Sequence, residues 1–88
     1  MEQKNVLTGY VIVVVDRGFV YVGNVEYDGQ MCVVTGAKNI RRWGTSRGLG
    51  ELAEKGPQSE TKLDEYGTVR IPAHAVISLI DTDKKLWT

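Results

Sequence analysis

The sequence feature that most constrains the fold is the run GYVIVVV at residues 9–15. From Tyr10 to Val15 every side chain is apolar, and most are β-branched, which favours a strand. The run is also too short for a typical helix. Successive side chains of a strand point to opposite faces. The sequence therefore predicts a strand that is buried on both faces.

Turn residues divide the following sequence into further strands. Asp16-Arg17-Gly18 turns the chain, and Asp28-Gly29 is a strong hairpin signal. Gly23, inside the second strand, predicts a bulge or a sharp bend. After the first strand we expect strands at residues 19–27, 31–35, 37–43, 68–71 and 75–80, with the punctuation at Gly36 separating the third from the fourth.

The pattern becomes helical after Trp43. Leu49, Leu52 and Ala53 lie at helical spacing within residues 48–55. Ser46 is a candidate cap for the start of this helix, and the Gly-Pro pair at residues 56–57 ends it. Residues 58–66 are polar and acidic, which predicts a surface loop.

These assignments predict a mainly β fold in a single domain covering residues 1–88. We expect a small, antiparallel, strongly bent sheet or an open barrel of five to six strands with one short helical insertion. The order of strands is similar to that of the Sm-like small barrels, a resemblance that concerns the fold alone. Because so short a chain buries only a thin core, we also expect a homo-oligomer.

The charges cancel overall but are unevenly placed. Eleven basic and eleven acidic residues give a net charge of zero, which argues against a general positive field for duplex DNA. Lys38, Arg41, Arg42 and Arg47 nevertheless follow one another with no acid among them. A local basic patch of this kind suits a compact anionic ligand.

The sequence lacks the residues for an intramolecular disulfide, for a metal site and for a membrane span. One cysteine, Cys32, and one histidine, His74, make neither an intramolecular disulfide nor a metal site, so we expect no metal and no cofactor. Cys32 stands in an apolar run and is interpreted as a small buried side chain. No apolar run approaches the length of a membrane span, and we expect a cytoplasmic protein that does not contact a membrane.

The candidate site is the stretch IRRWGTSRGLGEL at residues 40–52. Arginine binds phosphate in a bidentate fork, and a tryptophan ring stacks on bases. Glycine backbone and the start of a helix add N–H donors for an anion. The predicted ligand-binding residues are Arg41, Arg42, Trp43, Thr45, Ser46, Arg47 and Gly48.

Each of these residues also has a structural interpretation. Trp43 either faces the ligand or plugs the end of the barrel or an oligomer interface. Arg41 and Arg42 alternate on a strand, so one of them should point away as a surface residue. Ser46 is a ligand contact or a helix cap, and Arg47 is the better phosphate candidate because it lies next to the helix start.

Most of the chain resembles a family of small phage and prophage proteins of unknown function. The resemblance covers about residues 9–81, and its most specific part is the arginine-tryptophan segment followed by the LxELAxxG helix. The chain differs at Val14, where the family pattern has arginine, and it keeps only one of the two segment tryptophans, Trp43. The resemblance implies a viral accessory protein in a bacterial cytoplasm.

Together these features predict a binding protein rather than an enzyme. The sequence has no P-loop, nucleophile elbow, HxE metal motif or catalytic dyad. We expect a protein that binds and sequesters a nucleotide-derived immune signal, such as a cyclic oligonucleotide or a cyclic ADP-ribose, without cleaving it. The alternatives are a single-stranded RNA or DNA binder of Sm-like type and a protein-binding inhibitor of a host enzyme.

Overall fold

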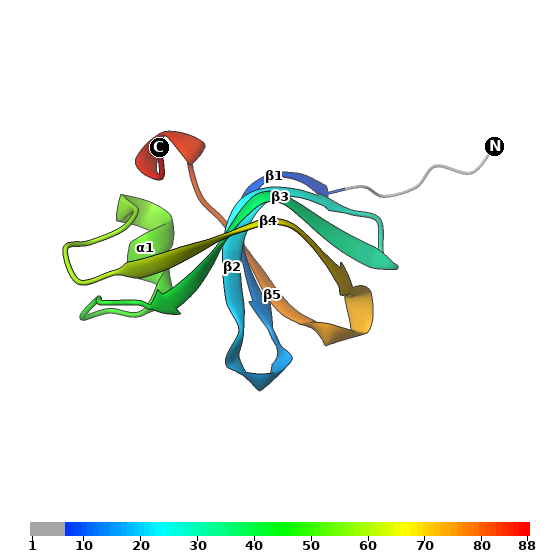
Figure 1. The fold of residues 1–88 in the computed structure, drawn as a ribbon, viewed down its shortest axis with the longest axis horizontal. Coiled ribbons are helices and arrows are strands. Elements are labelled where there is room, and N and C mark those ends of the chain that lie inside the picture. Colours follow the sequence, from blue (N-terminus) through cyan, green and yellow to red (C-terminus); the bar gives the residue numbers. More distant parts are fainter. Residues whose placement is uncertain (1–6) are drawn as a thin grey trace.

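The computed structural model describes residues 7–88, which form one five-stranded antiparallel sheet with a short helix (Figure 1). The order of strands across the sheet is β4-β3-β2-β1-β5. The elements are β1 Leu7–Val15, β2 Val20–Tyr27, β3 Met31–Arg42, α1 Leu49–Lys55, β4 Lys62–Pro72 and β5 Val76–Asp81. The prediction of a mainly β, bent and open sheet with one helical insertion is therefore confirmed.

The third and fourth predicted strands are one long strand, β3, which bends at Gly36. The pairing of β3 with β2 shifts register between Val22 and Asn24, where β3 carries one extra residue. A Cβ atom on Gly23 would lie 2.8 Å from Val34 Cγ1, so only glycine allows β3 to cross so closely. The irregularity predicted at Gly23 is confirmed, whereas the break predicted at Gly36 is wrong because a bulge bends a strand without ending it.

The predicted surface loop at residues 58–66 is wrong for its second half. Strand β4 begins at Lys62 and pairs with β3, with Lys38 opposite Glu65 and Arg42 opposite Lys62. β4 is an edge strand, and charged side chains are common on edge strands because they prevent pairing with other chains. The polar composition of residues 62–66 therefore predicted a loop where the structure has a strand.

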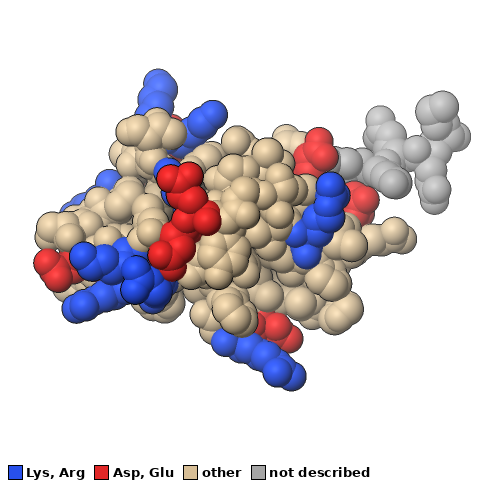
Figure 2. All heavy atoms as spheres, in the orientation of Figure 1, with Lys and Arg blue, Asp and Glu red and all other residues tan. Residues whose placement is uncertain are grey.

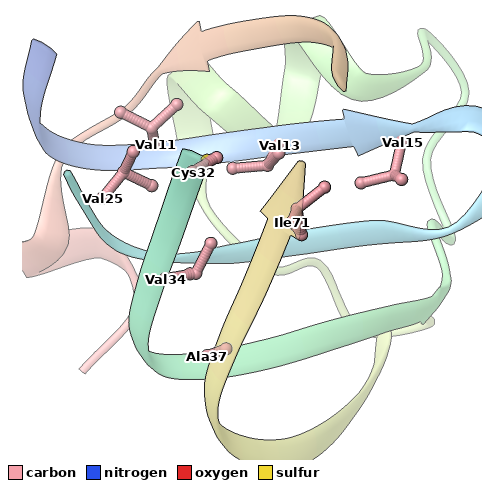
Figure 3. Close-up of a cluster of buried hydrophobic side chains, with 8 residues drawn as sticks. All are labelled: Val11, Val13, Val15, Val25, Cys32, Val34, Ala37 and Ile71. Carbon is pink, nitrogen blue, oxygen red and sulfur yellow. The ribbon is translucent and has the colours of Figure 1, made fainter. Parts of the chain in front are cut away.

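One face of the sheet carries the first hydrophobic cluster, drawn in Figure 3. Alternate residues of β1 contribute Val11, Val13 and Val15 to it. The other members are Val25, Cys32, Val34, Ala37 and Ile71. Cys32 is fully buried, as predicted, and burial raises the pKa of its thiol. The bent sheet thus folds over one face of its own central strands.

The opposite face carries a second cluster that includes Ile12 of β1. Here the cover comes from outside the sheet: Leu52 from α1 and Trp87 from the C-terminal segment are both buried. Its remaining members are Val20, Val22 and Ile40. Both faces of β1 are therefore buried, which confirms the prediction made from its sequence.

Hydrogen bonds connect the C-terminal segment to α1 and to the sheet. The Trp87 indole Nε1 donates to Thr82 Oγ1 at 3.0 Å, and Thr82 Oγ1 donates to the carbonyl of Ala53 in α1 at 2.6 Å. Lys38 Nζ of β3 donates to the carbonyl of Trp87 at 3.1 Å. The C-terminal segment is thus fastened to both the helix and the sheet.

The edge strands β4 and β5 are joined by a single 3₁₀ turn at Ala73–Ala75. The amide of Ala73 donates to the carbonyl of Gln30 at 2.9 Å, which fixes this turn to the β2–β3 hairpin. A link of three residues brings the ends of the two edge strands close together. The sheet therefore curls strongly, yet within residues 7–88 the two edges do not pair and the sheet remains open.

Truncating Leu52 should destabilise the second hydrophobic cluster. Leu52 is the only fully buried side chain of α1, so Leu52→Ala is expected to lower the free energy of unfolding by about 2–5 kcal/mol through lost burial and a cavity. Urea unfolding measures this change. Glu54→Ala, an exposed position on the same helix, is the control, and an equal loss in both variants would contradict the proposed role of Leu52.

The thiol of Cys32 should be inert in the folded protein. Because Cys32 is buried and its pKa is raised, its reaction with Ellman's reagent at pH 8 should be far slower than that of a free thiol. Adding urea below the unfolding midpoint should accelerate the reaction as opened molecules become populated. A native rate equal to that of the unfolded chain would show that the first cluster is not closed over this residue.

Candidate functional site

The predicted site residues lie at one end of the molecule, where β3 ends and the chain continues into the connection to β4. Residues 43–61 form this connection, here called the insertion, and α1 lies within it (Figure 1). Leu52 fastens the insertion to the second cluster. Leu49 and Ala53 pack against the same cluster, and further contacts around Trp43 join the two ends of the insertion.

Trp43 is more exposed than Trp87, with 43% of its surface accessible. Its carbonyl accepts a 2.6 Å hydrogen bond from the Thr61 hydroxyl at the other end of the insertion. A Cβ atom on Gly48 would lie 4.0 Å from the indole Cζ3, so the ring lies beside Gly48. Trp43 belongs to neither buried cluster of the described chain. Its backbone is held in place, and its indole is available to a ligand or to a second subunit.

Gly44 permits the tight closure of the insertion. Its φ is +64°, and a Cβ atom there would overlap the backbone of Glu60. The chain leaving β3 and the chain entering β4 therefore touch at this point. This contact determines where the neighbouring Trp43 lies.

Arg41 and Arg42 are both exposed at the end of β3 but have different surroundings. Arg41 Nε lies 3.0 Å from Asp64 Oδ2 in an exposed ion pair. Arg42 pairs with Lys62 across the strands and makes no ion pair within residues 7–88. The register between β3 and β4 slips between Ile40 and Arg42, so the strict alternation expected for the two arginines is interrupted there.

Glu51 organises the start of α1, and sequence reasoning did not assign it this role. Its carboxylate Oε1 accepts from the Arg47 amide at 3.1 Å and from the Ser46 hydroxyl at 3.5 Å. The helix begins at Leu49 with Gly48 as its N-cap, so the expected capping by Ser46 is wrong. The signal for Glu51 is an acid at the third helical position, where carboxylates commonly reach back toward the preceding residues. An anion approaching this helix start would meet the Glu51 carboxylate.

Thr45 is likewise engaged within the insertion, since its hydroxyl donates to the carbonyl of Gly48 at 3.0 Å. The Arg47 side chain, by contrast, is exposed and has no ion pair within residues 7–88. We call the group formed by Arg41, Arg42, Trp43, Arg47 and Lys62 the basic end. Figure 2 shows lysine and arginine side chains gathered over the end of the molecule that carries α1. Of the predicted site residues, the structure leaves Arg42, Trp43 and Arg47 as the groups most available to a ligand.

A second group consists of three aromatic side chains, of which Phe19 and Tyr66 are exposed and Tyr21 is half-buried. Phe19 and Tyr21 are stacked with ring centroids 6.4 Å apart and planes 8° from parallel, and Tyr66 meets Tyr21 edge-on at 5.7 Å. We call these three residues the aromatic row. Burial, and to a lesser extent Tyr66, raise the pKa of Tyr21, so its hydroxyl is neutral at physiological pH. Phe19 lies in extended backbone one residue before β2, and its spacing of two from Tyr21 in the sequence was the signal that the two rings lie on the same side of the chain.

Residues 7–88 hold neither a metal-binding cluster nor a helix that could span a membrane. No group of three or more histidine, cysteine, aspartate or glutamate side chains is placed to hold a metal ion. No helix in this part of the chain has the length and apolar character needed to cross a bilayer.

The fold and the site define a small protein with one bent antiparallel sheet, a helix-bearing insertion and an exposed tryptophan among basic side chains. Residues 8–88 match the model of the family described as a domain of unknown function, DUF6948, and the chain belongs to this family. No curated protein and no solved structure matches the chain significantly.

Two glycine substitutions in the insertion should act in opposite directions. Gly44→Ala places a Cβ against the Glu60 backbone at a positive φ, and is expected to reduce the free energy of unfolding by about 1–3 kcal/mol. Gly50→Ala meets nothing within 4 Å and should stabilise α1 by about 0.5–1 kcal/mol. Thermal unfolding of the two variants tests both signs. A Gly44→Ala protein as stable as the parent would show that the insertion closes less tightly than described.

Proposed function

We propose that this protein binds and sequesters a nucleotide-derived small molecule without cleaving it. The ligand class is a cyclic oligonucleotide or a cyclic ADP-ribose of the kind that bacterial immune systems make, and the protein would be a phage or prophage accessory protein acting in the bacterial cytoplasm. The observation that supports this proposal is the exposed Trp43 indole close in the chain to Arg42 and Arg47, two guanidinium groups without ion pairs in residues 7–88.

The chemistry of this group matches a nucleotide. Guanidinium groups bind phosphate oxygens in a bidentate manner, and an exposed indole offers a face for a base. Lys62, opposite Arg42 in the register, adds another positive charge. Because the chain as a whole is neutral, the attraction for anions is local, which suits a compact ligand.

Tight sequestration also requires enclosure. Small-molecule sites bury most of the surface of their ligand, whereas Trp43 and its basic neighbours lie on the outside of a single chain. A homo-oligomer would supply the missing wall, and the open edge at β5 offers backbone groups for such an assembly. The proposed sequestering form is therefore a homo-oligomer with the basic ends near one another.

Single-stranded RNA or DNA is the second candidate ligand. The observation that favours it is the openness of the basic end: 43% of Trp43 is exposed, as suits a ring on which one base of a longer strand stacks. Binding of this kind weakens steeply with salt and strengthens with the length of the strand. These two dependences separate it from binding of a discrete small molecule.

A thermal-shift screen with site variants tests the proposal. Cyclic dinucleotides, cyclic trinucleotides, cyclic ADP-ribose isomers and short oligonucleotides are screened against the parent protein, since a ligand that binds the folded state raises its melting temperature. Trp43→Ala and Arg47→Ala are each expected to weaken binding by about 1–3 kcal/mol while the protein stays folded. Arg70→Ala removes an exposed arginine from β4 outside the basic end and should bind as the parent does.

Three outcomes would count against sequestration. A response to oligonucleotides alone would favour the nucleic-acid alternative. A response to no ligand at all would redirect the search to a host protein as target. If Trp43→Ala loses its fold or its assembly while Arg47→Ala binds normally, the tryptophan is structural and the ligand site lies elsewhere.

A further inference from the structure

We propose that the aromatic row is the base-recognition part of the same binding surface: Phe19 and Tyr21 form a slot for one nucleobase, and Tyr66 closes one side of it. The ligand would then carry at least two bases joined by phosphate, one in this slot and one on Trp43. This inference rests on the proposed function, and it narrows the ligand to a cyclic or linear oligonucleotide.

The spacing of the two rings is the first observation. Stacked bases follow one another at about 3.4 Å, so a flat ring held between two others separates them by about 6.8 Å. The Phe19 and Tyr21 centroids are 6.4 Å apart, and their planes are within 8° of parallel. The centroid distance is the upper limit of the gap between the ring faces, so a base entering between them requires the rings to separate by at least a few tenths of an ångström.

The exposure of the rings is the second observation. Phe19 is 50% exposed and Tyr66 is 52% exposed, which leaves large apolar surfaces in water. Tyr21 is half-buried and packs against the first cluster, so one wall of the slot is fixed to the core. A base inserted here would cover aromatic surface that the chain itself leaves uncovered.

The neighbouring strand connects the slot to the basic end. Tyr21 pairs with Asn39 of β3, and Arg41 lies two residues further along β3 in the direction of Trp43. At about 3.3 Å per residue, Arg41 lies roughly 7 Å beyond Asn39 along β3, and Trp43 follows where this strand ends at Arg42. The protein would thus offer two aromatic sites with basic side chains between them. A ligand that fills both sites needs two bases joined by a phosphate, and a ligand with a single base would leave one site empty.

Polar groups along this path suit the backbone of such a ligand. Arg41 binds Asp64 through Nε, which leaves its terminal nitrogens as donors for a phosphate. Asn39 Nδ2 donates to the carbonyl of Val20 at 3.3 Å, which leaves its carbonyl oxygen as an acceptor. Asp64, the acid that faces this path from β4, is already paired with Arg41.

The test measures stacking directly with a fluorescent base. The probes are a linear dinucleotide and a tetranucleotide carrying 2-aminopurine, whose fluorescence falls when it stacks, and unlabelled cyclic dinucleotides as competitors. Phe19→Leu keeps apolar volume but removes the ring, and Phe19→Tyr keeps the ring. We expect Phe19→Leu to abolish most of the quenching and to weaken binding roughly 5- to 100-fold, and Phe19→Tyr to retain both. Ile77→Ala, an exposed apolar residue on β5, is the matched control and should leave binding unchanged.

The outcomes separate this inference from the proposed function. If the parent protein binds the probes and Arg47→Ala weakens binding, yet Phe19→Leu binds and quenches as the parent does, the slot is wrong and the basic end still binds nucleotides. If the parent protein binds none of the probes or competitors, the slot is wrong, and a flat response to cyclic trinucleotides and cyclic ADP-ribose isomers as well would overturn the proposed function too. Full competition by a cyclic dinucleotide at fixed stoichiometry identifies a small signal, whereas affinity that rises with strand length and falls with salt identifies a single strand.

Discussion

The burial of both faces of β1 is the constraint on which the rest of the structure depends. Val13 and Ile12 are adjacent in the chain and point into different hydrophobic clusters, so the fold needs two covers. The curled sheet provides the first by folding over itself. The insertion and the C-terminal segment provide the second through Leu52 and Trp87. The helix is therefore required by the sheet, and the surface it carries is placed as a consequence of core formation.

This dependence gives the candidate site its rigidity. Trp43 is exposed, yet Gly44 brings its neighbourhood against the Glu60 backbone, and Thr61 holds its carbonyl. The insertion is thus closed at its neck and anchored at its helix. Because the backbone that carries the exposed ring is fixed, less conformational entropy would be lost if the ring stacked on a ligand of the proposed kind. The aromatic row gains the same advantage from the packing of Tyr21 against the first cluster.

The sequence predicted the elements whose signals lie within one short segment of the chain, and it missed those that depend on contacts between distant segments. The run at residues 9–15, the turn at Asp28 and the helical spacing of Leu49 and Leu52 are local, and each led to a correct element. The start of β4 depends on pairing with β3, which polar composition does not reveal. Glu51 displaced Ser46 from its expected role through a contact that forms only once the helix start has folded. The aromatic row joins residues 19 and 66, which no sequence window connects. The predicted ligand remains a prediction.

The C-terminal segment has a mechanical consequence. Trp87 is bound to Thr82, Thr82 to the carbonyl of Ala53, and Lys38 to the carbonyl of Trp87, so the chain end is tied directly to β3 and, through Thr82, to α1. In Figure 1 this end lies beside α1. A force pulling on the end would load these few side-chain bonds in turn, whereas the sheet shares its load among many ladder bonds. These bonds of Trp87 would therefore break before any strand separates, and the second cluster would first lose one of its two covers from outside the sheet.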